Sequence, residues 1–120
     1  MKMLENKVAI ITGAGSGIGR AIAILYAAEG ARIVASDIDE HGGQETVSTI
    51  LAAGGEAVFI KADTSKPEDN KNTVDLAVSK FGGLHIAVNN AGIGGPISPV
   101  GEYPIDGWDK VISINLSGVF

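Results

Sequence analysis

The chain has 120 residues and no cysteine, which excludes disulfides, thiolate metal ligands and cysteine nucleophiles. Its longest unbroken apolar run, Ala21 to Ala28, is far shorter than the roughly 20 residues that a membrane-spanning helix needs. Basic residues are few: 9 Lys and Arg stand against 14 Asp and Glu, which gives a net charge of -5. This acidic balance argues against a nucleic acid or an anionic membrane as a partner.

Hydrophobic residues make up 45% of the chain, so a real core can form, and the length is that of one domain. We therefore expect a single domain over residues 1–120. The opening residues "MKMLENK" lack the hydrophobic region of a signal peptide, and we expect a cytoplasmic protein. His41 and His85 have no partners at metal-ligand spacing, so no metal site is predicted.

Apolar segments typical of buried strands alternate with segments of helical periodicity. This alternation predicts parallel βαβ units and an open α/β sheet. The last helical segment reaches Phe120 without a cap or a breaker, so we expect the sheet to be truncated after its fourth strand and part of the following helix. The predicted strands are 7–11, 31–36, 57–61 and 85–90, and the predicted helices are 18–29, 39–53, 67–81 and 107–120.

The spacing of apolar residues also predicts which helix faces are buried. The first helix should bury Ile18, Ile22 and Leu25, and Trp108 should pack in the core. The third helix should bury Val74, Ala77, Val78 and Phe81.

The turn between the first strand and the first helix, "TGAGSGIGR", holds four glycines in nine residues. A strand-to-helix turn in a βαβ unit directs N–H groups and the positive end of the helix dipole at its ligand, which suits a pyrophosphate. Gly13 would permit the tight turn, Gly17 would let phosphates touch the backbone, and Gly19 would let the helix pack closely. The alternative is a flexible loop with chance glycines.

Asp37 ends the second strand, eighteen residues beyond Gly19. In a dinucleotide-binding fold an acidic residue at this interval accepts hydrogen bonds from the adenosine ribose and repels a 2′-phosphate. The neighbouring positions Ser16 and Ile38 are not basic, so the pattern favours NAD over NADP. The alternative role for Asp37 is to cap the following helix.

Four motifs in order resemble those of the short-chain dehydrogenases/reductases: "TGAGSGIG", "ADTS" from Ala62, "NNAG" from Asn89 and "INLSG" from Ile114. The resemblance covers nearly the whole chain. It implies a Rossmann-type doubly wound parallel sheet and an oxidoreductase that transfers hydride between a nicotinamide cofactor and an alcohol or ketone. It also implies a homo-oligomer, either a tetramer or a dimer.

The resemblance assigns roles by position. Gly13, Ser16, Gly17 and Ile18 would hold the phosphates, while Asp37 and Ile38 would meet the adenosine ribose. Asp63 and Thr64 would contact the adenine, and Ile114 would lie near the nicotinamide ribose. Asn115 would be the asparagine of the catalytic Asn-Ser-Tyr-Lys tetrad, at a helix kink where it holds a water; otherwise it is an ordinary polar helix residue. The cofactor floor would be formed by Asn90, Ala91 and Gly92.

One departure from the family pattern is large. Its base is a tyrosine followed four residues later by a lysine, but Tyr26 and Tyr103 are followed at that distance by Gly30 and Gly107. We therefore predict that residues 1–120 alone are inactive. Two alternatives stay open: a module that binds NAD or an adenine nucleotide without chemistry, and a scaffold protein that keeps the fold without a ligand.

Overall fold

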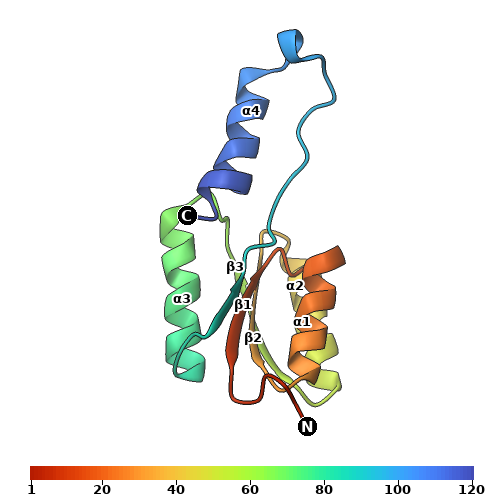
Figure 1. Cartoon of the computed structure of the whole chain (residues 1–120), viewed down its shortest axis with the longest axis vertical. Helices are drawn as coiled ribbons and strands as arrows, with labels where there is room; N and C mark the ends of the chain where they lie inside the picture. Colours follow the sequence, from red (N-terminus) through yellow and green to blue (C-terminus); the bar gives the residue numbers. More distant parts are fainter.

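A computed structural model describes all residues of the chain, 1–120. Four strands alternate with three helices, and a fourth helix lies beyond the sheet (Figure 1). The strands are β1 (Val8–Thr12), β2 (Arg32–Asp37), β3 (Glu56–Lys61) and β4 (Ile86–Val88). The helices are α1 (Gly17–Ala28), α2 (Glu40–Ala52), α3 (Pro67–Phe81) and α4 (Ile105–Ile112), with a 3-10 turn η1 (Val100–Glu102) and a π-helical turn η2 (Ser113–Ser117).

The sheet has the order β3-β2-β1-β4 with every pair parallel, which confirms the predicted fold class. Alternate residues of β1 serve the two faces, because successive side chains of a strand point in opposite directions. Ala9 and Ile11 join the core cluster under α1 and α2, whereas Val8 and Ile10 join the cluster under α3. Figure 1 shows the resulting three layers, with α3 on one side of the sheet and α1 and α2 on the other.

The buried face of α1 differs from the prediction. Ile18 and Leu25 are 73% and 59% exposed, while the buried residues are Gly19, Ala23 and Ala27. These small side chains let the helix axis approach the sheet closely: a Cβ at Gly19 would collide with the carbonyl oxygen of Gly13. The expected role of Gly19 in close helix packing is thus observed, and the expected burial of Ile18 and Leu25 is wrong.

The prediction for α3 is also partly wrong. Ala77 is buried and Phe81 packs against the core, but Val74 and Val78 are exposed. The second buried residue is Thr73, whose hydroxyl donates to the Asp69 carbonyl oxygen one turn earlier at 2.8 Å. Because that hydroxyl is satisfied within the helix, the polar side chain can replace an apolar one at the sheet.

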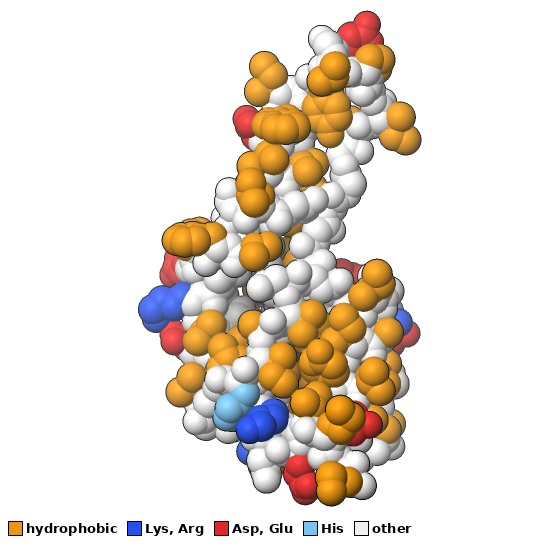
Figure 2. Space-filling view, viewed as in Figure 1, with side chains coloured by type: hydrophobic (Ala, Val, Ile, Leu, Met, Phe, Trp, Pro, Cys, Tyr) orange, Lys and Arg blue, Asp and Glu red, His pale blue; other side chains and the backbone are white.

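Beyond β4 the chain leaves the sheet and returns through α4, which projects from the body (Figure 1). The molecule is therefore elongated, with principal extents of 53 × 24 × 24 Å. No residue of α4 is buried, and Trp108 is 58% exposed, so its predicted place in the core is wrong. Figure 2 shows hydrophobic side chains exposed over this projecting part. None of the helices is long and apolar enough to cross a membrane.

Candidate dinucleotide-binding site

The glycine turn connects β1 to α1 through backbone that other residues rarely adopt. Gly13 and Gly17 both have left-handed φ angles, of 67° and 54°. A Cβ at Gly13 would lie 2.7 Å from the Asn90 amide nitrogen, so this glycine is required for close packing within the protein. A Cβ at Gly17 would meet nothing within 4 Å. The two glycines therefore differ: Gly13 makes room for the chain itself, and Gly17 leaves room outside it.

The N-terminus of α1 presents free hydrogen-bond donors at this open place. The N–H groups of Ser16, Gly17 and Ile18 donate to no acceptor in the chain. The first N–H groups of any helix lack partners within it, and the helix dipole adds a partial positive charge there. The turn thus offers several aligned donors to an anion, without a Cβ at Gly17 in the way.

Asp37 holds this turn from the end of β2. One carboxylate oxygen accepts from the Gly15 N–H at 2.7 Å, and the other accepts from the Asp39 N–H at 2.9 Å. The capping role considered for Asp37 falls to Asp39 instead, whose side chain accepts from the Gly42 N–H at the start of α2. The Asp37 carboxylate is partly exposed and retains lone pairs for a further donor.

Asp63 lies two residues beyond β3, in a tight turn. Its carboxylate accepts from the Ser65 hydroxyl at 2.6 Å and from the Ser65 N–H at 2.9 Å. These hydrogen bonds, helped by the charges of Lys66 and Lys110 and opposed by burial, lower the pKa of Asp63 below its ordinary value. Asn70 donates to the Thr64 carbonyl oxygen at 2.9 Å and so fixes the turn to α3.

A hydroxyl that the sequence reasoning missed joins the glycine turn to β4. Thr12 Oγ1 accepts from the N–H groups of Asn90 and Ala91, both at 3.0 Å. The Asn90 amide in turn donates to the Thr12 and Gly13 carbonyl oxygens at 3.1 and 3.3 Å. The threonine that opens the "TGAGSGIG" motif and the second asparagine of "NNAG" are therefore parts of one contact, which the order of the motifs alone does not reveal.

Asn115 lies in the π-helical turn η2, an irregular helix as expected. Both ends of its side-chain amide bind the backbone of Ile93: Oδ1 accepts from the N–H and Nδ2 donates to the carbonyl oxygen, each at 2.9 Å. This paired contact fixes the segment after β4 against η2. Each amide atom keeps a second hydrogen-bonding position, a lone pair on Oδ1 and a hydrogen on Nδ2.

These elements enclose a cleft of about 530 Å³ at the carboxyl ends of the strands, a usual size for a ligand site. Of the fourteen predicted site residues, Gly19 and Asn115 are outside the lining: the first is buried beneath the turn, and the second contacts Ile93. The other twelve line the cleft: Gly13, Ser16, Gly17, Ile18, Asp37, Ile38, Asp63, Thr64, Asn90, Ala91, Gly92 and Ile114.

Comparison with known proteins agrees with this geometry. The family model for short chain dehydrogenases matches residues 7–120. The chain belongs to the short-chain dehydrogenase family. It is 52% identical over 116 residues to cyclohexanol dehydrogenase from Acinetobacter sp. (strain SE19), which covers 97% of this chain and 46% of that relative.

Solved structures of this oxidoreductase family have the same fold. A short-chain dehydrogenase/reductase from Burkholderia phymatum in complex with NAD is 39% identical, with a TM-score of 0.94 over 99% of this chain and 42% of that one. Levodione reductase is 37% identical, with a TM-score of 0.93 over 98% of this chain and 46% of that one. The chain therefore spans less than half the length of these family members.

Lys110 is a further lining residue that the family motifs did not indicate. It lies in α4, four residues before Ile114, and residues at this separation share a helix face. This spacing would have indicated that Lys110 lies beside the cleft if Ile114 had first been known to line it. Lys110 brings a positive charge to a cleft whose other charged lining residues are Asp37 and Asp63. No group of three or more His, Cys, Asp or Glu side chains in the structure is arranged to hold a metal ion.

Proposed function

We propose that residues 1–120 form the NAD-binding part of an oxidoreductase that transfers hydride between nicotinamide and an alcohol or ketone. The observation that carries the proposal is the combination of free N–H groups at Ser16, Gly17 and Ile18 with open space at Gly17. A pyrophosphate needs such donors and such an approach. Family membership and the NAD-bound relative support the same conclusion.

The remaining cleft residues would each contact a different part of the cofactor. Asp37 and Ile38 would hold the adenosine ribose, and Asp63 with Thr64 would hold the adenine. The floor of Asn90, Ala91 and Gly92 would support the middle of the dinucleotide. NAD, when bound, supplies the hydride acceptor of the reaction, while the protein residues fix its orientation and exclude water.

At the other end of the cleft we assign Ile114 to the nicotinamide ribose and Asn115 to the catalytic machinery. Asn115 would hold η2 and the segment after β4 in place, because its side-chain amide pairs with the Ile93 backbone. The acid or base that moves the substrate proton is not among the residues of this chain, which has no Tyr-x-x-x-Lys sequence.

We propose NAD rather than NADP as the cofactor because Asp37 is the only charged residue of the cleft at the end of β2. A carboxylate there would repel a 2′-phosphate, and neither Ser16 nor Ile38 offers a compensating charge. The test is titration of the full encoded protein with NADH and with NADPH, in which nicotinamide fluorescence reports binding. We expect NADH to bind at least about tenfold more tightly than NADPH, and a protein that binds neither nucleotide would refute the proposed site.

A second candidate function is binding of the dinucleotide without chemistry, which the free N–H groups and the open space at Gly17 would serve equally well. The two candidates differ in turnover. Cyclohexanol is a suitable first substrate, because the Acinetobacter relative is named for it. NAD reduction by the full encoded protein with a cyclic or secondary alcohol supports the enzyme, whereas NAD binding without turnover across such alcohols supports the binding module.

A further inference from the structure

The peptide groups of Gly15, buried in the middle of the glycine turn, are held from two sides. The Gly15 N–H donates to the Asp37 carboxylate at 2.7 Å, and its carbonyl oxygen accepts from Arg20 Nη2 at 2.6 Å. A Cβ at Gly15 would lie 2.7 Å from that same carboxylate oxygen, so the close contact requires glycine. The turn is therefore anchored by an anion on one peptide and by a cation on the next.

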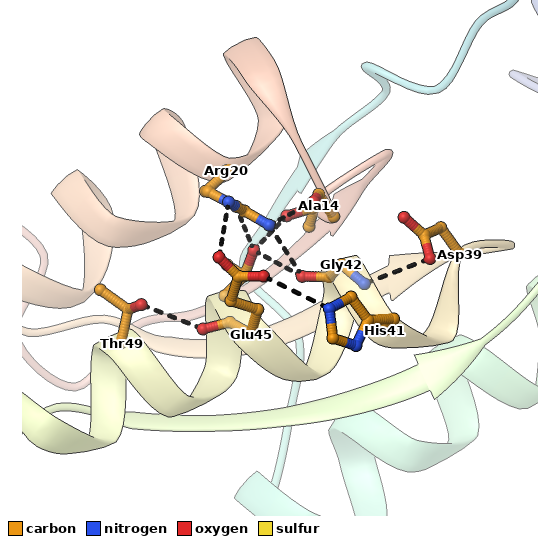
Figure 3. Close-up of polar contacts among 9 residues, drawn as sticks. Ala14, Arg20, Asp39, His41, Gly42, Glu45 and Thr49 are labelled. Atoms are coloured by element: carbon orange, nitrogen blue, oxygen red, sulfur yellow. Dashed lines mark hydrogen bonds and ion pairs between the residues drawn. The ribbon is translucent and has the colours of Figure 1, made fainter.

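Arg20 makes its contacts on the side of the turn that faces α2 (Figure 3). Besides Gly15 it donates to the Gly42 carbonyl oxygen at 3.2 Å and to Thr46 Oγ1 at 3.0 Å. Thr46 is fully buried, and its hydroxyl, which accepts from Arg20, donates in turn to the Ala14 carbonyl oxygen at 2.8 Å. Two carbonyl groups of the turn, those of Ala14 and Gly15, are thus tied to α2 through one guanidinium and one hydroxyl.

The position of Arg20 is unfavourable for the helix itself. A cation near a helix N-terminus opposes the helix dipole, and no acidic residue lies in the first turn of α1 to compensate. Glu45 of α2 lies 3.4 Å away and is largely exposed, so this ion pair contributes little. Arg20 is not among the residues that line the cleft and does not face the proposed cofactor. The useful contacts of Arg20 are therefore those to the backbone of the turn.

These contacts set the direction of a cofactor-facing N–H. In a trans peptide the carbonyl oxygen and the following N–H point in opposite directions. Because Arg20 holds the Gly15 carbonyl oxygen toward α2, the Ser16 N–H points away from α2. Ser16 lines the cleft, and its N–H has no acceptor in the chain. We propose that Arg20, supported by Thr46, is a positioning residue that aims the Ser16 N–H at the pyrophosphate; the proposal rests on the proposed NAD site.

The test compares a ligand that has the pyrophosphate with one that lacks it. Dissociation constants for NAD and for adenosine are measured by ligand-observed NMR on the full encoded protein, with thermal unfolding in parallel. The variants are Arg20→Met, which removes the donors, Arg20→Lys, which keeps the charge, and Thr46→Val, which removes the hydroxyl. Arg32→Met is the matched control, since Arg32 pairs with Glu56 at 3.0 Å at the opposite end of the sheet.

We expect Arg20→Met to weaken NAD binding about tenfold or more, the loss typical of a hydrogen bond to a charged group, with adenosine binding changed by less than about twofold. Arg20→Lys and Thr46→Val should fall between this variant and the wild type, and they carry the test if Arg20→Met does not fold. Arg32→Met should affect neither ligand. Equal losses for both ligands, or no loss for NAD in a folded variant, would overturn the positioning role. A wild-type protein that binds no NAD would instead overturn the proposed function.

Discussion

Replacing Asp37 with alanine should affect both the stability of the glycine turn and the choice of cofactor. The substitution leaves the N–H groups of Gly15 and Asp39, now 2.7 and 2.9 Å from the carboxylate, without their acceptor. A hydrogen bond to a charged group contributes about 1.5–3 kcal/mol, but water can replace part of each bond at this partly exposed site. We therefore expect the free energy of unfolding to fall by about 1–2 kcal/mol.

The effect on the cofactor follows from the same charge. A 2′-phosphate about 4 Å from the Asp37 carboxylate would be repelled by about 1 kcal/mol in bulk water and by about 4 kcal/mol near a protein surface. Alanine removes this repulsion together with the acceptor for the ribose hydroxyls. Since 1.4 kcal/mol is a factor of ten, the ratio of NADPH to NADH dissociation constants should fall at least about tenfold. Loosening of the turn should weaken both nucleotides alike and cancel in this ratio.

Fluorescence titration of both nucleotides and urea unfolding of the same samples measure these two effects. Asp39→Ala is the matched control. It removes the Asp39 carboxylate, which caps α2 by accepting from the Gly42 N–H, but leaves Asp37 in place. The control should lose stability with an unchanged cofactor ratio. Equal affinity of the wild type for the two nucleotides would refute the reasoning, and so would an Asp37→Ala protein that keeps the wild-type ratio.

Four further predictions concern other parts of the chain. Gly17→Ala should weaken NAD binding about tenfold by placing a methyl group in the phosphate approach, whereas Gly54→Ala, at another left-handed glycine in open space, should leave binding unchanged. A polypeptide of residues 1–120 should show no dehydrogenase turnover, since a placed acid or base contributes about 10²–10⁴-fold; an NAD-dependent rate that survives removal of host enzymes would contradict this. The same polypeptide should self-associate in light scattering at micromolar concentration through the exposed apolar side chains of α4, and a monodisperse 12.2 kDa species would refute this. Ser65→Ala should raise the pKa of Asp63 in an NMR titration, because it removes the hydroxyl that donates to the carboxylate. The lowered pKa of Asp63 stabilises the folded protein above the ordinary pKa of 3.8, and this contribution is lost as the pH falls below that value. The variant should therefore lose less stability in acid than the wild type.

The parts of the fold that the sequence predicted are those that depend on local pattern. The continuous apolar runs of β1 and β2 indicate strands covered on both faces, and the helices between them require parallel pairing. The buried face of α1 was mispredicted because hydrophobicity does not report how closely a helix approaches a sheet. The close approach made by Gly19 and Ala23 buries small side chains and leaves Ile18 at the surface.

The candidate site was predictable where a motif lies at the end of a strand. Gly13 and Asp37 follow β1 and end β2, and neighbouring parallel strands end at the same edge of the sheet. The contacts between motifs were not predictable, because they depend on side-chain reach across that edge. The hydrogen bonds of Thr12 to β4 and the place of Lys110 beside the cleft are of this kind.

The position of β4 in the sheet has a consequence for the order of folding. The contact between Asn90 and Thr12 joins residues 78 apart in the sequence, whereas β1 and β2 pair across a single helix. At a synthesis rate of about 5–20 residues per second, Asn90 is added about 4–16 s after Thr12. The glycine turn and Asp37 can thus come together on the ribosome before the floor of the cleft exists. A nucleotide that needs both the glycine turn and the floor of the cleft can stabilise the nascent chain only after β4 has paired with β1. Cofactor binding therefore belongs to the late stage of folding.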